Sequence, residues 1–106
     1  MKRYKRIEQS ICSFDFINDG NYSAREINGV IERACEECGV DFVASDYRSV
    51  DYSDYPEYAG EVVSQCGFDF NWESRYGYSA KDMREALEEG LSDLGYELIG
   101  IDFEGR

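Results

Sequence analysis

Two seven-residue segments decide the fold of this chain: SICSFDF at Ser10–Phe16 and SQCGFDF at Ser64–Phe70. Both contain the pattern C-x-F-D-F, and they lie 54 residues apart. A second matching pair follows, YSAREI at Tyr22–Ile27 and YSAKDM at Tyr78–Met83, with a separation of 56 residues. The chemistry agrees at each aligned position, and a loop easily accommodates the two-residue difference. The chain is therefore interpreted as an internal duplication.

Each half of the duplication has the pattern of a strand followed by a helix. C-x-F-D-F alternates apolar and polar residues with a period of two, which is typical of a half-buried strand. Ser23 and Ser79 occupy the N-cap positions of two helices, and Gly39 and Gly95 the positions at which these helices end. Between these limits, apolar residues recur with helical spacing and predict one buried stripe on each helix. The stripes are Ile27, Val30, Ile31, Ala34, Cys35 and Cys38 in the first helix, and Met83, Ala86, Leu87, Gly90, Leu91 and Leu94 in the second.

A further strand after each helix gives the order β-α-β-β-α-β, which is the ferredoxin-like pattern within the α+β class. We expect two helices on one face of a four-stranded antiparallel sheet, with the C-terminal strand of each half at an edge. The whole chain, residues 1–106, is then a single domain. Its repeat halves are about residues 7–44 and 61–103, and an acidic, tyrosine-rich connector, residues 45–60, joins them.

The alternation also predicts which side chains face away from the helices. Asp15 and Asp69 are expected as near neighbours on this open face, in the central pair of strands. The last strand is predicted to be apolar on both faces. Its apolar residues are Leu98 on one face and Ile99, Ile101 and Phe103 on the other. The second apolar face either covers part of the open sheet or contacts another chain.

The charge of the chain limits what it can bind. Its 106 residues contain 23 acidic and 11 basic side chains and no histidine, a formal net charge of −12. Because nucleic acid and anionic lipid are bound by cationic side chains, direct contact with nucleic acid or with a membrane is not expected. A compact polyanion is instead attracted to a basic groove on another protein, including a groove that holds nucleic acid.

The sequence indicates neither a membrane span nor a secretion signal. Its uninterrupted apolar runs are too short to cross a bilayer, and the N-terminal MKRYKR lacks the apolar segment of a signal peptide. The expected compartment is the cytoplasm.

No catalytic or metal-binding set of residues is expected. A Ser–His–Asp arrangement needs a histidine, and the glycine spacing that cradles phosphates does not occur. Cys35 and Cys38 align with two leucines of the second helix, so they are interpreted as small apolar core groups rather than as metal ligands or a redox pair. Asp15 and Asp69 are interpreted as solvated polar positions, with binding of a cation or small molecule as the alternative. The expected protein is not an enzyme and needs no cofactor.

Carboxylates on the helices and in the connector are the candidate binding groups. Carboxylates one helical turn apart lie about 5–6 Å from each other, which approximates the spacing of phosphates along a nucleic-acid strand. Tyrosines in the connector would add the flat contact groups that are enriched at interface hot spots. The predicted partner-binding residues are Glu32, Glu36, Glu37, Asp46, Asp51, Tyr52, Asp54, Tyr55, Glu57, Glu85, Glu88 and Glu89.

In its size, its charge and the layout of these acidic residues, the chain resembles the small inhibitors encoded by phages and mobile elements, such as anti-CRISPR and anti-restriction proteins. The resemblance extends over the whole chain but includes no sequence motif. The basic residues Lys2, Arg3, Lys5 and Arg6 depart from a uniform mimic of DNA. The resemblance implies a non-enzymatic inhibitor that blocks a nucleic-acid-handling complex in the host cytoplasm. The alternative is an acidic protein–protein interaction or regulatory module, which could be a homodimer formed through the last strand or the open sheet face.

Overall fold

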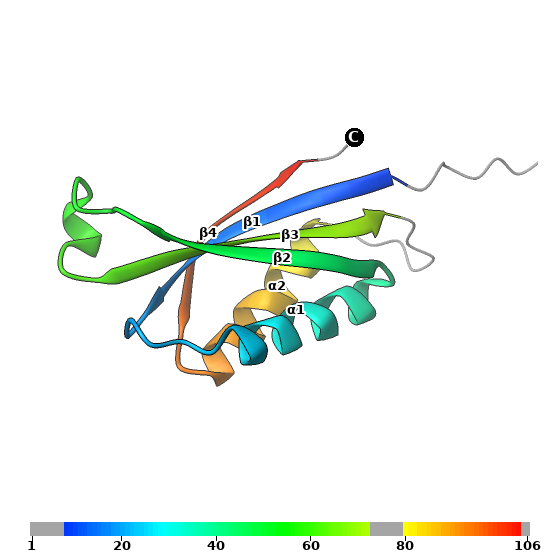
Figure 1. Cartoon of the computed structure of the whole chain (residues 1–106), viewed down its shortest axis with the longest axis horizontal. Coiled ribbons are helices and arrows are strands. Elements are labelled where there is room, and N and C mark those ends of the chain that lie inside the picture. Colours follow the sequence, from blue (N-terminus) through cyan, green and yellow to red (C-terminus); the bar gives the residue numbers. More distant parts are fainter. Residues whose placement is uncertain (1–7, 73–79, 105–106) are drawn as a thin grey trace, which may run out of the picture.

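The computed structural model describes residues 8–72 and 80–104 of the chain (Figure 1). Strands and helices follow in the expected order of strand, helix, strand, strand, helix, strand. The elements are β1 (Glu8–Asn18), α1 (Ala24–Cys38), β2 (Asp41–Val50), the short 3-10 helix η1 (Pro56–Tyr58), β3 (Val62–Trp72), α2 (Ala80–Asp93) and β4 (Glu97–Glu104). Neither α1 nor α2 combines the length and the apolar character that a membrane span needs.

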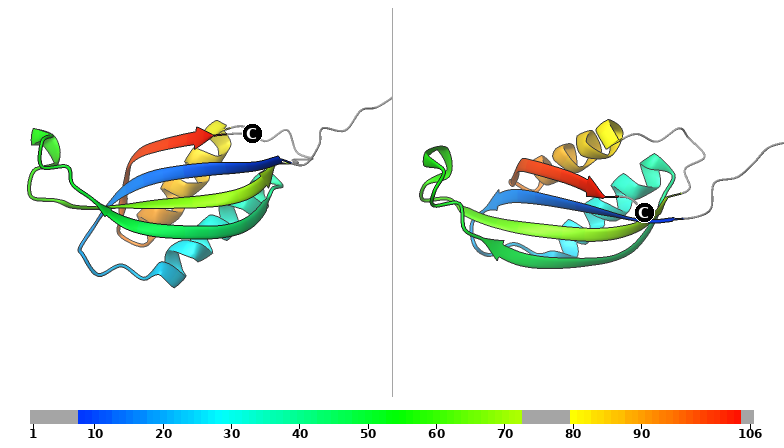
Figure 2. Two further views of the ribbon diagram at one scale, coloured as in Figure 1. Left: turned by 45° about the horizontal axis from the view of Figure 1, so that its top comes forward. Right: turned by 90° about the horizontal axis from the view of Figure 1, so that it is seen from above.

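The four strands form one antiparallel sheet in the order β2-β3-β1-β4. β1 and β3, which carry the repeated pattern, form the centre of the sheet, and the second strand of each half lies at an edge. Both helices cover the same face of the sheet, as Figure 1 and Figure 2 show. The predicted α+β class, the antiparallel sheet and its two helices are thereby confirmed.

The hydrophobic core lies between the helices and one face of the central strands. The buried residues of these strands are Cys12, Phe14 and Phe16 of β1 and Cys66, Phe68 and Phe70 of β3. Phe14 and Phe68 meet edge to face across the two strands, with ring centroids 6.2 Å apart. From the helices, Ile27, Ile31, Met83, Leu87 and Leu91 complete the core with fully buried side chains. Since burial of each large apolar side chain contributes about 1.5–3 kcal/mol, this layer stabilises the fold.

α1 begins at its predicted cap, Ser23, and both helices end at the predicted glycines. The Ser23 hydroxyl accepts a hydrogen bond of 3.3 Å from the backbone N–H of Glu26, at the start of α1. Gly39 and Gly95, with φ of 75° and 88°, adopt the left-handed conformation after α1 and α2. After each glycine, the next backbone N–H donates to a helix carbonyl 2.9 Å away. Ser79, the predicted cap of α2, lies outside the described residues.

The prediction that β4 is apolar on both faces is wrong. The pairing of β4 with β1 shifts at Asp15, because Gly100 lies opposite Asp15 whereas Leu98 lies opposite Phe16. The extra residue, Ile99, forms a bulge that changes the phase of the alternation. As a result, Leu98, Ile101 and Phe103 all pack against the core. The open face of β4 instead presents Glu97, Gly100, Asp102 and Glu104.

β2 includes the first part of the segment that was assigned to the connector. Residues 45–50 belong to β2, and Tyr47 within them packs against the core. The link between β2 and β3 is residues 51–61, which contain η1. Pro56, the only proline of the sequence, is the first residue of η1.

The two helices approach each other closely at Gly90 of α2. A Cβ atom on this residue would lie 2.5 Å from Cγ1 of Val30 in α1. Gly29, in the interior of α1, differs because no atom lies within 4 Å of the position that its Cβ would take. Packing therefore requires glycine at position 90 but not at position 29.

Replacing these two glycines by alanine should have opposite effects on the free energy of unfolding. Gly29→Ala gains helix propensity, about 1 kcal/mol, without a clash. Gly90→Ala gains the same propensity but overpacks against Val30, which costs about 1–3 kcal/mol, so the net effect should be destabilising. Adding Val30→Ala to Gly90→Ala should relieve the clash. Urea denaturation measures all three variants, and equal stabilisation by both single substitutions would contradict the close approach of the helices.

Candidate functional site

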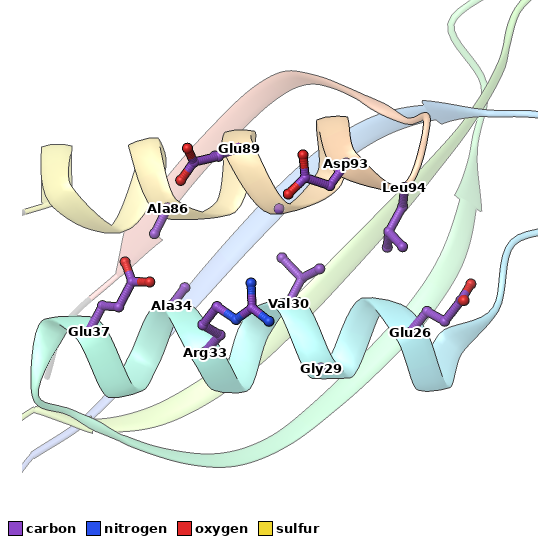
Figure 3. Close-up of a pocket in the computed structure, with 11 residues that line it drawn as sticks. Glu26, Gly29, Val30, Arg33, Ala34, Glu37, Ala86, Glu89, Asp93 and Leu94 are labelled. Atoms are coloured by element: carbon purple, nitrogen blue, oxygen red, sulfur yellow. The ribbon is translucent and has the colours of Figure 1, made fainter.

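The predicted helix carboxylates are spread over the helical layer and do not form a single cluster. All six are exposed: Glu32, Glu36 and Glu37 on α1, and Glu85, Glu88 and Glu89 on α2. Glu37 and Glu89 line the groove between the two helices (Figure 3). The other four do not line this groove. The structure therefore brings together one predicted carboxylate from each helix.

The groove between the helices combines acidic and apolar groups. It has a volume of about 370 Å³. It is lined by the carboxylates of Glu26, Glu37, Glu89 and Asp93, by the cation Arg33, and by apolar side chains that include Val30, Ala34, Ala86 and Leu94. Lysine and arginine bury aliphatic stems while their charged ends stay near polar groups. Such a lining suits a basic side chain of a partner protein.

The predicted carboxylates outside the helices occupy two further places. Asp51, Asp54 and Glu57 are exposed in the connector, which lies at one end of the sheet (Figure 1). The backbone N–H of Ser53 donates to Oδ1 of Asp51 at 2.9 Å, and hydrogen bonds from Ser53 lower the pKa of Asp51. Asp46 belongs to β2 and lies on the open face of the sheet. The predicted acidic residues thus occupy three separate surfaces.

Three tyrosines of the connector form an aromatic cluster. The ring centroid of Tyr52 lies 5.3 Å from that of Tyr55 and 5.4 Å from that of Tyr58. The Tyr52 hydroxyl donates to the carboxylate of Asp15 on β1. This hydrogen bond raises the pKa of Tyr52 to about 12. Tyr52 therefore anchors the connector to the sheet, whereas Tyr55, with 54% of its surface exposed, is available to a partner.

The carboxylate of Asp15 is held by a row of side chains across three strands. Nε2 of Gln65 on β3 donates to Oδ1 of Asp15 at 2.9 Å. Nε of Arg48 on β2 in turn donates to Oε1 of Gln65 at 2.8 Å. These three residues are paired in register across the sheet. Arg48 is the one cationic residue within the strands β1 to β4, and its side chain takes part in this row through the hydrogen bond to Gln65.

The prediction that Asp15 and Asp69 are near neighbours is wrong. Asp15 pairs with Gln65, whereas Asp69 pairs with Ile11. The two aspartates are four residues out of register, which corresponds to about 13 Å along the strands. β1 and β3 are the equivalent strands of the two repeat halves, and they run antiparallel. Equivalent residues of these strands therefore lie opposite each other at a single pair, Ser13 and Gly67. This separation leaves no geometry for shared acid–base chemistry or for joint binding of one cation.

The open face carries carboxylates that were not among the predicted binding residues. Asp69 on β3 and Asp102 and Glu104 on β4 lie on the same face as Asp46. Asp102 and Glu104 were missed because the expected phase of β4 placed its apolar residues on this face. Their regular alternation with Ile101 and Phe103 is the sequence signal that identifies them.

The four cysteines lie in the core and form no disulfide bond, which confirms the interpretation of Cys35 and Cys38 as apolar core groups. Burial raises the pKa of Cys38 to about 11 and the pKa of both Cys35 and Cys66 to about 12. Burial also raises the pKa of Cys12. These thiols stay protonated at neutral pH and are poor nucleophiles.

Among the residues that the structure describes, no three Cys, Asp or Glu side chains are grouped so that they could hold a metal ion.

No protein-family model and no curated protein matches the sequence. Solved structures are similar in fold. An "unknown protein" from Galdieria sulphuraria superposes with a TM-score of 0.53 at 12% identity, over 94% of this chain and 50% of that one. A formyltetrahydrofolate deformylase from Pseudomonas putida gives 0.49 at 12% identity, over 91% and 28%. A dinuclear metal-binding peptidase of the M20 family from Bacillus subtilis gives 0.47 at 9% identity, over 93% and 25%. The chain spans half or less of each of these proteins, and the similarity concerns the fold alone.

The hydrogen bond between Tyr52 and Asp15 should be visible in the titration of Tyr52. Folding raises the pKa of this tyrosine from 10.0 to about 12, so its contribution to stability is complete below pH 10 and is lost as the pH rises through 12. NMR of tyrosine labelled with ¹³C at Cζ, assigned with Tyr52→Phe, measures the midpoint. Asp15→Asn removes the acceptor charge and should move the midpoint down toward pH 10. An unchanged midpoint in Asp15→Asn would show that this carboxylate does not hold Tyr52.

Proposed function

We propose that this chain is a non-enzymatic inhibitor of the anti-CRISPR or anti-restriction kind, which binds a nucleic-acid-handling protein of the host and competes with DNA or RNA for its basic site. The imbalance of surface charge carries the proposal. Side chains that the structure describes include five cations and several times as many carboxylates. The cations are Arg25, Arg33, Arg48, Lys81 and Arg84. Among them, Arg48 donates a hydrogen bond to the side chain of Gln65.

The proposed mechanism is electrostatic. A surface with this excess of negative charge attracts a basic groove from a distance and accelerates association. On contact, carboxylates take the place of phosphates as the partners of lysine and arginine, and the groove between α1 and α2 accepts aliphatic stems. The same negative charge repels nucleic acid, so the chain competes with DNA or RNA without binding either.

The scaffold has two features that support this mechanism. Most of the described carboxylates lie on regular strands and helices, so little backbone freedom is lost on binding. The connector is anchored through Tyr52 and presents the exposed ring of Tyr55 as a contact group. We assign this scaffold to the ferredoxin-like class and place its action in the host cytoplasm.

The second candidate function is an acidic interaction or regulatory module whose partner does not handle nucleic acid. The exposure of Tyr55 favours a protein contact in this case as well. A homodimer formed through the open sheet face is disfavoured, because carboxylates such as Asp46 and Asp102 of the two copies would repel each other. Competing nucleic acid separates the two candidates, since it displaces the partner of an inhibitor but not that of an unrelated module.

Charge reversal on α2 should weaken binding to the partner. Wild type and the variant Glu85→Lys/Glu88→Lys/Glu89→Lys are immobilised and incubated with a host-cell lysate, with and without double-stranded DNA. Wild type should retain nucleic-acid-binding proteins, and both DNA and added salt should release them. The triple variant should retain about tenfold less, because the replaced carboxylates now repel a basic site.

Arg84→Glu is the matched control for this experiment, because it lies on the same helix and changes the charge in the opposite direction. It should retain at least as much partner as wild type. Retention that is insensitive to DNA and to salt, or that survives the triple reversal, would contradict the proposed function.

A further inference from the structure

Within residues 8–72 and 80–104, no layer covers the middle of the sheet face opposite the helices. Among these residues the connector reaches this face at one end, where Tyr52 meets Asp15. Figure 2 shows the helices on one side and no element over the other side of β1 and β4. A sheet that faces solvent on one side is common, so exposure alone does not indicate a function. The composition of the face distinguishes it from an ordinary solvated surface.

Every strand contributes a carboxylate to this open face. They are Asp46 on β2, Asp69 on β3, Asp15 on β1, and Glu97, Asp102 and Glu104 on β4. Arg48 is the one cation within the strands, so the carboxylates of this face outnumber it. An ordinary exposed strand face mixes both signs of charge. This face is therefore negative, and a partner that covers it must bring positive charge.

The centre of the face is a row of small residues between two of these carboxylates. Asp46, Gly67, Ser13 and Asp102 lie opposite one another on the four strands. With neighbouring strands about 4.8 Å apart, Asp46 and Asp102 are separated by about 14 Å. An α-helix with its side chains is about 10–12 Å wide, so a helix seated on this row could reach both carboxylates.

The fold itself does not require glycine at position 67. A Cβ atom there would have the Ser13 hydroxyl at 3.6 Å as its nearest neighbour, which is ordinary van der Waals contact. Gly67 does not have a positive φ, and its pairing with both neighbouring strands is regular. Glycine in the interior of a strand weakens the strand, and one reason for its presence is the close approach of another chain.

We propose that the open sheet face docks an arginine-rich segment of a partner protein, seated over Ser13 and Gly67 between Asp46 and Asp102. Arginine matches this face because its planar guanidinium pairs with carboxylates through two hydrogen bonds. Two copies of the chain that meet through their open faces do not fit, and a nucleic acid does not fit either, since each would bring negative charge to a negative surface. The inference rests on the proposed function only in taking the partner to be a basic protein, and it concerns a surface opposite the helices.

Fluorescence polarisation with a labelled arginine–alanine helical peptide tests the docking surface directly. The same peptide with glutamine in place of arginine is the ligand control. Asp46→Asn/Asp69→Asn/Asp102→Asn removes three charges from the open face, and Asp19→Asn/Glu61→Gln/Asp82→Asn removes three exposed charges that belong to none of the predicted binding residues. The open-face variant should bind about tenfold more weakly than wild type, and the control variant should bind within about twofold of wild type.

Gly67→Thr separates docking from charge and from folding. It leaves the net charge unchanged and introduces a residue that strands favour, so the urea midpoint should stay equal or rise. The added side chain should still weaken peptide binding at least about threefold by blocking the centre of the face. Equal losses in the two triple variants would indicate attraction to any polyanion, and unchanged binding in Gly67→Thr would exclude docking over Ser13. Either result would overturn the inference.

The lysate experiment with the α2 charge reversal distinguishes failure of this inference from failure of the proposed function. If DNA-sensitive capture depends on α2 while the open-face variants bind the peptide normally, the inference fails and the function stands. If the peptide docks on the open face as described but DNA does not release the captured proteins, the inhibitor function fails and the docking surface stands.

Discussion

The strict alternation of apolar and polar residues in β1 and β3 is the constraint on which the rest of the structure depends. Burial of Phe14, Phe16, Phe68 and Phe70 beneath the helices fixes the phase of both central strands. A slip of one residue would turn every phenylalanine to water and every aspartate to the core. The same constraint that builds the core therefore places Asp15 and Asp69 on the opposite face. In this chain, packing and surface charge are two consequences of one pattern.

The excess of carboxylates has an energetic cost that the core must offset. Self-repulsion destabilises a compact state, and the described side chains supply only five cations against it. Two features limit this cost. Carboxylates lie on both sides of the sheet, and Asp15 is held by Tyr52 and Gln65. The remaining charge persists on the helices, on the connector and on the open sheet face, and these surfaces are directed toward solvent.

Much of the fold could be predicted from the sequence because local patterns specify it. The duplication predicted the order of elements, the buried stripes of both helices and the helix ends at Gly39 and Gly95. The bulge at Ile99 could not be predicted, since it depends on how β4 pairs with β1 rather than on the residues of β4 alone. That single extra residue moved Ile101 and Phe103 into the core and Asp102 onto the open face.

The candidate site was less predictable than the fold for the same reason. Charge and exposure of the helix glutamates follow from helical periodicity, and the structure leaves them exposed as expected. Distances across the sheet depend on register, so the separation of Asp15 and Asp69 and the row from Asp46 to Asp102 required the strand pairing. The role of Tyr52 as an anchor also depends on where the connector folds back, which no local pattern specifies.

The central claim is that the carboxylates of this protein are not neutralised by its own cations. Urea unfolding of the wild type at about 10 mM and about 500 mM NaCl tests it most directly, because salt screens repulsion between exposed charges. If the carboxylates are uncompensated, the urea midpoint rises as salt is added. A midpoint that stays constant or falls would show that internal ion pairs already balance the charge, and it would contradict the account.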